Sequence, residues 1–312
     1  MGMHALDSSL RMHFRLFLAF LSTAIVGCAA DKFSVNEVAD ASVADASADA
    51  PSGDDSATDL DATEAKDGAS DKAPFDAITR AALELWLRAD DLTAGPVASW
   101  TDASPRKHDA IAAGTACVSP TLVAGPAGSN KQVVAFNGTN ACMQLPAGFA
   151  NFTQGLSLLI VARTHPQSGT TTDGFLRLAQ TNGAAPLANM ILFGRDGATT
   201  LRYVTQSPTG VAVGSLNVDD GVKDDSWHTY EVFEDAGTAE GSVSAVLRVD
   251  GVAFPSGTVG VPAITSRDAN NIGRGPSSFL AADIAEIILL SRKLEDPMRN
   301  AIEAYLRNKW KL

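Results

Sequence analysis

From Phe75 to the end of the chain, short apolar stretches alternate with segments rich in Gly, Asp, Asn and Pro. Stretches of this length, with turn-forming residues at both borders, are typical of β-strands and too short for most helices. Many short strands with few helical patterns between them predict an all-β sandwich for residues 75–312. The stretches that predict strands are Leu83–Arg88, Gln132–Phe136, Leu156–Arg163, Met190–Arg195, Thr200–Thr205, Trp227–Phe233 and Asp283–Ser291.

The segment VSAVLRVDGVAFP, residues 243–255, gives the sharpest local signal. Its apolar residues alternate with more polar ones, which places Val243, Ala245, Leu247 and Val249 on one face of a strand. The dipeptide Asp-Gly at 250–251 then favours a two-residue hairpin turn, because both positions must adopt positive φ. We therefore expect a β-hairpin here.

One stretch near the C-terminus predicts a helix. Asp296 is a suitable N-cap, and Pro297 is favoured at the first helical position. The apolar residues that follow recur with helical spacing, so they form a stripe that has to be buried. We expect the helix to lie against the sandwich as a lid, with Trp310 anchoring its last turn. The stripe consists of Met298, Ile302, Tyr305 and Leu306.

Residues 34–74 have a very different composition. Ala, Asp, Ser and Thr dominate this segment, and it contains no aromatic residue. From Asp31 to Pro74 there are twelve acidic residues and three lysines, so most of the chain's net charge of −12 lies here. Such a segment cannot bury enough apolar surface to offset its ordering entropy. We expect residues 28–74 to form a disordered, charge-extended spacer rather than an acidic binding tail.

The N-terminus has the features of an export signal. Arg11 and Arg15 precede the apolar run LFLAFLSTAIVG, residues 16–27, which is too short to span a bilayer comfortably. Ile25, Val26, Gly27 and Cys28 follow in the order of a lipobox, so residues 1–27 resemble the signal peptide of a bacterial lipoprotein. That resemblance implies cleavage before Cys28 and lipidation of its thiol. A plain secretory signal and an uncleaved anchor are the alternatives.

The residue after Cys28 is Ala29 rather than Asp. By resemblance to lipoproteins of enteric bacteria, this favours the outer membrane or cell surface over retention at the inner membrane. The expected location is therefore the bacterial cell envelope, with the membrane as one partner. Two cysteines remain after lipidation, Cys117 and Cys142. An exported chain passes through an oxidising compartment, so we expect these two to form a disulfide.

Two sequence blocks carry a family resemblance. The segment ALELWLRADDL, followed by ASWTDASPRKHDA, is similar to the opening of laminin-G-like, concanavalin A-like jelly-roll domains of bacterial surface proteins. The segment ADIAEIILLSRKLEDPMRNAIEAYLRNKW is similar to their closing strand and helix. The resemblance implies a jelly-roll domain over residues 75–312 that binds carbohydrate or protein. The matching positions are Trp86, Ala89, Asp90, Trp100, Asp102, Ser104, His108, Ala110, Glu286, Leu294, Ile302, Tyr305, Leu306 and Trp310.

Glucanases of this fold hydrolyse glycosidic bonds with paired carboxylates, which on a strand requires a spacing of two or four residues. Their Glu-x-Asp-x-Glu triplet does not occur in this sequence. Glu231 and Glu234 are three residues apart, as are Asp283 and Glu286, so each pair is expected on opposite faces. Glu286 is expected on one face with Ile284, Ile288 and Leu290, where we interpret it as a structural carboxylate that ties neighbouring groups.

Other chemistries have no clear signature. His108, His165 and His228 lack metal-ligand spacing, and no catalytic or phosphate-binding motif occurs. No clustered basic face suggests a nucleic-acid partner. Some laminin-G-like domains bind calcium through aspartates, so the resemblance implies that several aspartates could be calcium ligands here. We interpret these aspartates mainly as turn residues. No cofactor is expected otherwise. The acids in question are Asp90, Asp91, Asp102, Asp219 and Asp220.

These observations favour a lipid-anchored, non-catalytic jelly-roll domain that binds a glycan or protein at the cell envelope. A glycoside hydrolase or lyase whose carboxylates meet only in space, and a purely structural surface module, are the alternatives. Sugar sites usually expose aromatic rings. All four tryptophans lie in core-like patterns, which weighs against a lectin; they are Trp86, Trp100, Trp227 and Trp310.

Overall fold

The computed structural model describes residues 74–93, 95–112, 117–167, 172–181, 187–219, 221 and 224–312. The lipobox, Cys28 and the acidic segment up to residue 73 lie outside the described residues, so the expectations for them stay predictions. In the part of the chain that the structure describes, no helix has both the length and the apolar character needed to cross a membrane.

Nine strands of the described residues form the first sheet, here called sheet A. All strand pairings within it are antiparallel. In spatial order the main path is β14 (Val252–Ala253), β13 (Ser242–Val249), β12 (Trp227–Glu234), β7 (Leu156–Thr164), β17 (Ala281–Leu290), β5 (Gln132–Asn137) and β4 (Thr121–Ala124). In addition, β1 (Leu83–Arg88) pairs with β17, and β15 (Gly257–Gly260) pairs with β13.

Eight further strands of the described ranges form sheet B, which is also antiparallel. Its order is β11 (Ala212–Val218), β10 (Thr200–Gln206), β9 (Ala188–Asp196), β8 (Thr172–Gln180), β16 (Asn271–Ile272), β6 (Met143–Gln144), β3 (Ala110–Ile111) and β2 (Ser99–Trp100). The predicted strands and the hairpin are therefore confirmed. In that hairpin, Asp250 and Gly251 both have positive φ, 52° and 78°.

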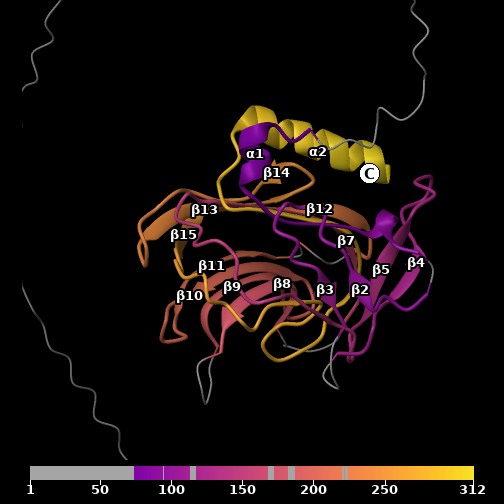
Figure 1. The fold of residues 1–312 in the computed structure, drawn as a ribbon, viewed down its shortest axis with the longest axis horizontal. Coiled ribbons are helices and arrows are strands. Elements are labelled where there is room, and N and C mark those ends of the chain that lie inside the picture. The colour runs from indigo at the N-terminus through magenta and orange to yellow at the C-terminus, as the bar shows by residue number, and fades with distance from the viewer. Residues whose placement is uncertain are drawn as a thin grey trace, which may run out of the picture. The chain divides into compact units, whose positions relative to one another are not determined.

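The two sheets stack face to face and bury the main core between them (Figure 1). Phe175 from β8 stacks on Tyr230 from β12, with ring centroids 5.2 Å apart. The Tyr203 hydroxyl from β10 donates a 2.6 Å hydrogen bond to Glu234 of β12. We call the faces that meet in this core the inner faces, and the others the outer faces. An all-β sandwich with a C-terminal helix is thus confirmed.

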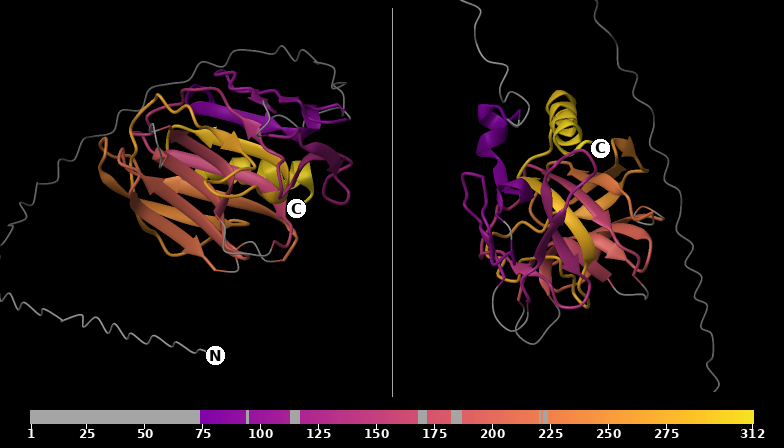
Figure 2. Two further views of the ribbon diagram at one scale, coloured as in Figure 1. Left: turned by 90° about the horizontal axis from the view of Figure 1, so that it is seen from below. Right: turned by 90° about the vertical axis from the view of Figure 1, so that its right-hand side faces the viewer.

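The helices lie against the outer face of sheet A (Figures 1 and 2). The described residues contain α1 (Ala77–Ala81), a short 3₁₀ turn η1 (Ala89–Asp91) and α2 (Asp296–Trp310). The predicted lid is α2, and its Ile302, Leu306 and Trp310 are buried. The prediction for its start was wrong by one residue. Glu295 has extended backbone geometry and is the N-cap, whereas Asp296 is already helical and its carboxylate pairs with Arg299 at 2.6 Å.

A β-bulge in β17 changes which acidic residues share a face. Asp283 pairs with Arg163 of β7, whereas Glu286 pairs with Val161 after a register shift that follows Ile284. Arg163 and Val161 are two residues apart on one strand and therefore share a face. Asp283 and Glu286 consequently lie together on the outer face, and Ile284 lies on the inner one. The prediction of opposite faces was wrong, because strict alternation does not hold across a bulge.

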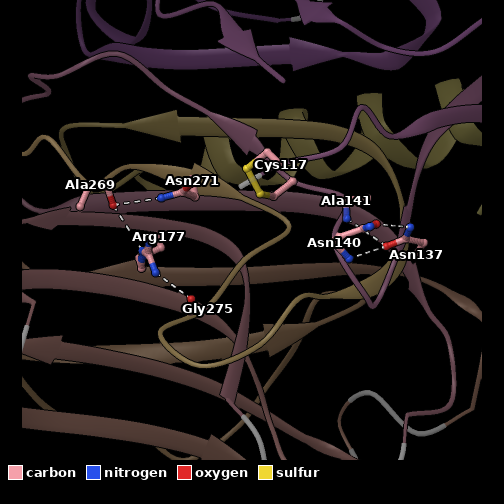
Figure 3. The surroundings of a disulfide bond; sticks show 9 residues. Cys117, Asn137, Asn140, Ala141, Arg177, Ala269, Asn271 and Gly275 are labelled. Carbon is pink, nitrogen blue, oxygen red and sulfur yellow. Dashed lines mark hydrogen bonds between the residues drawn. A yellow bond between two sulfur atoms is a disulfide. The ribbon is translucent and has the colours of Figure 1, made fainter. Parts of the chain in front are cut away.

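Cys117 and Cys142 form a disulfide, with their Cα atoms 4.9 Å apart (Figure 3). Cys142 immediately precedes β6 of sheet B, and Cys117 lies shortly before β4 of sheet A. The bond therefore connects the segment that leads into β4 with the start of β6. The nearby turn after β5 is organised by Asn137. Its side-chain oxygen accepts hydrogen bonds from the backbone N–H groups of Thr139, Asn140 and Ala141, at 2.9, 3.0 and 3.0 Å.

Candidate functional site

A row of side chains crosses the outer face of sheet A beyond its helix-covered part. Residues directly opposite each other in antiparallel strands share a face and lie close together. The register pairs Thr121 with Ala135, Ala135 with Asp283, Asp283 with Arg163, and Arg163 with Trp227. Five neighbouring strands, β4, β5, β17, β7 and β12, thus each contribute one residue to a single row.

Asp283 is the charged centre of this row. Arg163 donates to Asp283 Oδ2 from Nη2 at 2.6 Å and from Nε at 3.2 Å. On the other side, His165 Nε2 lies 3.1 Å from Asp283 Oδ1, and His165 Nδ1 lies 2.9 Å from Asp225 Oδ1. The Asp283 side chain is only 3% exposed, whereas those of Arg163 and His165 are 34% and 33% exposed. A buried carboxylate therefore fixes two cationic or polar groups that remain accessible.

The row borders a cavity of about 540 Å³, here called the sheet A basin. One wall is apolar and is built from β4 and β5, and the other carries Arg163, His165 and Asp283. A largely apolar hollow with a few convergent polar groups is the usual form of a small-ligand site, for which volumes of roughly 300–1,000 Å³ are typical. Its lining residues are Thr121, Val123, Ala124, Ala135, Phe136, Asn137, Arg163, His165 and Asp283.

Trp227 stands at the end of the row, and the Arg163 guanidinium lies over its ring at 5.5 Å from the centroid. The sequence placed Trp227 in a core-like pattern with the other tryptophans. Trp86, Trp100 and Trp310 are indeed buried, but Trp227 is only partly buried on the outer face. Its ring nevertheless packs against the main core cluster, so the expectation holds only in part for this residue.

Glu286 lies in the same outer face but beneath α2, and it is fully buried. Its Oε1 accepts hydrogen bonds from Trp86 Nε1 at 2.7 Å and from the Tyr305 hydroxyl at 3.1 Å. Its Oε2 accepts one from Trp310 Nε1 at 2.8 Å and pairs with Lys309 Nζ at 2.9 Å. Both oxygens are therefore occupied by protein donors. The interpretation of Glu286 as a structural carboxylate is confirmed.

Glu231 and Glu234 lie on opposite faces of β12, as the sequence predicted. Glu231 is buried under α2, where it accepts a hydrogen bond from Arg248 at 3.1 Å. Burial and the nearby Glu303 raise the pKa of Glu231 to about 8. Glu234 points into the core, and burial raises the pKa of Glu234 to about 7. Neither carboxylate borders the sheet A basin.

Two of the aspartates considered for calcium are engaged by basic side chains. Asp90 lies 2.8 Å from Lys309 and 3.2 Å from Lys131. Burial acts to raise the pKa of Asp90, but the two ammonium groups outweigh it, and the pKa is lowered overall. Asp91 pairs with Arg88 at 2.6 Å. These contacts give both acids a role without a cation.

Asp102 is buried and organises a turn. It accepts hydrogen bonds from the N–H groups of Trp86, Ser104 and His108, at 2.8, 2.8 and 2.7 Å, and from the Ser104 hydroxyl at 2.6 Å. Asp219 accepts a bond from Thr200, and Asp220 lies outside the described residues. Across the described ranges, no three His, Cys, Asp or Glu residues come together in a way that could hold a metal ion.

His228 is held by two carboxylates at the rim of the sandwich. Its Nδ1 lies 2.6 Å from Asp250, and its Nε2 lies 2.9 Å from Asp224. These hydrogen bonds, with Asp250 as the larger contributor, raise the pKa of His228 to about 9. The imidazole is therefore protonated at neutral pH, and a protonated ring cannot ligate a metal. The His108 ring packs against Phe149 at a tilt, with centroids 4.2 Å apart.

Sequence reasoning named Asp283 and His165 but did not connect them, and it did not single out Arg163. The available signal was the charged residue at the end of an otherwise apolar strand, LSLLIVAR. This pattern did not indicate which residue pairs with Arg163, because Arg163 and Asp283 are 120 residues apart in the chain. Only the pairing of β7 with β17 brings them together.

Comparison with known proteins supports the fold. No protein-family model matches the chain, and no curated protein matches it either. Among solved structures, the botulinum neurotoxin serotype D ligand-binding domain in complex with N-acetylneuraminic acid is similar, with 9% identity and a TM-score of 0.50. That match covers 73% of this chain and 52% of the toxin domain, so the chain spans about half of its length.

A sialidase of Trypanosoma rangeli in complex with sialic acid is also similar, with 14% identity and a TM-score of 0.46. The match covers 73% of this chain and 33% of the sialidase. At such low identity the likeness to the toxin domain concerns the fold alone. The geometry described above defines this part of the chain as an all-β, two-sheet sandwich domain with a C-terminal helix and a polar basin on one outer face.

Proposed function

We propose that this chain is a lipid-anchored protein of the bacterial cell envelope whose laminin-G-like domain binds a saccharide in the sheet A basin. The observation that supports it best is the row across five strands, in which buried Asp283 orients Arg163 and His165 at an open cavity. Polar groups held in this way lose little side-chain freedom on binding, which favours recognition of a ligand with several hydroxyls.

The basin suits one sugar unit. The apolar side of a pyranose ring would contact Val123 and Ala135, while its hydroxyls would meet Arg163, His165 and the Asn137 amide. A glycan fits this site better than a protein partner, because a stable protein interface buries about 800 Å² on each side. A hollow of about 540 Å³ matches a small ligand instead.

Asp283→Asn should weaken saccharide binding roughly ten- to a hundredfold, because hydrogen bonds to a charged group contribute about 1.5–3 kcal/mol. The variant keeps the side-chain size but removes the charge that orients Arg163 and His165. A glycan array with the purified domain would identify a ligand, and calorimetry would then compare affinities. Asp235→Asn, in an exposed ion pair with Lys293, is the matched control and should bind normally. Equal affinity of both variants, or an array without any bound glycan, would refute the proposal.

The anchoring half of the proposal rests on the order Ile25, Val26, Gly27 and Cys28, followed by an acidic spacer with no aromatic residue. A spacer of this composition would hold a folded domain away from the membrane surface, because its like charges repel one another. Ala29 favours the outer membrane. An envelope position would bring the sheet A basin into contact with surface or wall glycans.

Cys28→Ser should abolish labelling with radioactive palmitate and move the protein from the membrane fraction to the soluble one. The thiol is the acceptor of the lipid, and a hydroxyl at this position cannot replace it in a lipobox. Ala30→Ser, two residues further on, leaves the lipobox unchanged and serves as the control. Palmitate labelling of the Cys28→Ser protein at the normal level would exclude lipidation at this residue.

A further inference from the structure

Arg177 occupies an unusual place on the outer face of sheet B. It lies in β8 and pairs with Leu192 of β9 on one side and with Asn271 of β16 on the other. Leu192 belongs to a small apolar cluster that is separate from the core between the sheets, so this row faces outward. Asn271 pairs with Gln144 of β6, and Gln144 pairs with Ile111 of β3. The row thus passes from a cation through two amides to an apolar side chain.

Among the described residues, the Arg177 guanidinium is bonded to backbone carbonyls alone. Its Nε donates to Ala269 O at 3.3 Å and its Nη1 to Gly275 O at 2.7 Å (Figure 3). The residue is only 6% exposed, yet no carboxylate of the described residues pairs with it. Buried Arg195, by contrast, pairs with Asp173 at 2.9 Å. A buried charge without a counter-charge is costly. Arg267 is also buried without an acid partner in the described ranges, but all three of its guanidinium nitrogens donate to backbone carbonyls, whereas Arg177 uses only two of its nitrogens there.

A second arginine lies in the segment that Arg177 binds. The Arg274 guanidinium rests over the Phe279 ring at 5.1 Å from the centroid, and within the described ranges it has neither a hydrogen bond nor an ion pair. Arg274 directly precedes Gly275, whose carbonyl Arg177 binds. Burial, and then the charge of Arg274, lower the pKa of Arg177 to about 10. Two like charges thus share one region, and an anion bound between them would relieve both desolvation and repulsion.

We propose that Arg177 and Arg274 form the anion-binding part of a second saccharide site, on the outer face of sheet B, that takes the carboxylate or sulfate group of an acidic sugar. Guanidinium groups bind such anions through paired, charge-assisted hydrogen bonds. Arg177 has Nη2 left for this purpose, and Arg274 has its whole fork. The exposed Gln144 amide and Ile111, which is 47% exposed, would contact the next sugar unit along the row.

This site is distinct from the sheet A basin and does not depend on it. The two lie on opposite outer faces of the sandwich, since Arg163 and Asp283 belong to sheet A and Arg177 to sheet B. A purely structural role for Arg177, which would be to hold the segment from Ala269 to Gly275, gives a different expectation. In that case an acidic sugar would bind no better than its neutral counterpart.

Calorimetry with 3′-sialyllactose, lactose 3′-sulfate and lactose provides the test. Lactose 3′-sulfate differs from lactose only in the charged group, whereas 3′-sialyllactose presents its carboxylate on an additional sugar unit. At least one anionic probe should bind tenfold or more tightly than lactose, and the stronger of the two identifies the preferred anion. Arg274→Gln should remove this preference while lowering the thermal midpoint only slightly, because the guanidinium loses just its contact with the Phe279 ring and has no hydrogen bond or ion pair among the described residues. Arg177→Lys, which keeps the charge, should retain part of the preference.

Asp283→Asn serves as the matched control and separates this proposal from that for the sheet A basin. It should leave the preference for the anionic probe intact, even if it weakens binding of a neutral glycan in the basin. The proposal would be overturned if neither anionic probe binds more tightly than lactose. It would equally be overturned if Arg274→Gln keeps the full preference, or if Asp283→Asn removes it.

Discussion

Trp310→Ala should lower the thermal midpoint of the domain by roughly 6–20 °C. Removing a fully buried tryptophan costs about 3–5 kcal/mol, and for a domain of this size each kcal/mol shifts the midpoint by about 2–4 °C. Trp310 is 0% exposed, and its ring closes the last turn of α2 against sheet A. The loss is a large part of a domain's usual stability of about 5–15 kcal/mol.

The cost has a polar part as well. Trp310 Nε1 donates to Glu286, a fully buried carboxylate that also binds Trp86, Tyr305 and Lys309. When the Trp310 N–H group is removed, Lys309 is the remaining partner of Glu286 Oε2 among the described residues. Trp310→Phe keeps most of the ring but removes the N–H group, so it should cost less than Trp310→Ala and measure the hydrogen bond separately.

Circular dichroism at 222 nm and differential scanning calorimetry would follow both variants. Leu312→Ala is the control, because Leu312 lies two residues further on and is 38% exposed. It should unfold at the wild-type temperature. If Trp310→Ala shifted the midpoint by no more than a degree or two, α2 would not be a packed lid, and its apolar stripe would have to serve another purpose.

The domain should become less stable as the pH rises from about 5 to about 9. Burial raises the pKa of Glu234 from 4.5 to about 7, and burial with nearby Glu303 raises that of Glu231 from 4.5 to about 8. Hydrogen bonds that the ring of His228 donates to Asp250 and Asp224 raise the pKa of His228 from 6.5 to about 9. In each case the folded state binds its proton more tightly than the unfolded chain does.

The direction of the pH effect follows from this difference. The two glutamates stabilise the fold fully below pH 4.5, and their contribution is lost as the pH rises through about 7 and 8. The contribution of His228 is complete below pH 6.5 and is lost as the pH rises through about 9. Carboxyls with a lowered pKa, such as that of Asp90, act in the opposite sense, but only at pH values below their usual 3.8.

Thermal midpoints measured at half-unit steps of pH would reveal this decline. Glu231→Gln should flatten the slope between pH 4.5 and 8, because an amide replaces the protonated carboxyl without titrating. Glu295→Gln, at an exposed position next to α2, should leave the slope unchanged. A midpoint that stays constant or rises between pH 6 and 9 would contradict the assignment of these protonated groups.

The local elements could be predicted from the sequence because their signals are local. Alternation over 243–249 with Asp250-Gly251 specifies a hairpin, and Pro297 with a helical apolar stripe specifies α2. Strand β8 (172–180) was missed, since it is buried on both faces and so shows little alternation. Helix α1 (77–81) was missed because five residues carry too short a pattern for helical periodicity.

The candidate site depended on the tertiary structure. Its row takes one residue from each of five strands that lie far apart in the chain, and strand register is a non-local property that no short window of sequence contains. The bulge after Ile284 brought Asp283 onto the same face as Glu286, against the simple count of residues. Trp227 has the same kind of local pattern as the buried tryptophans, yet the folded sheet leaves it only partly buried. The sequence thus determined most of the strands, the hairpin and the C-terminal helix, whereas packing and register decided which side chains meet.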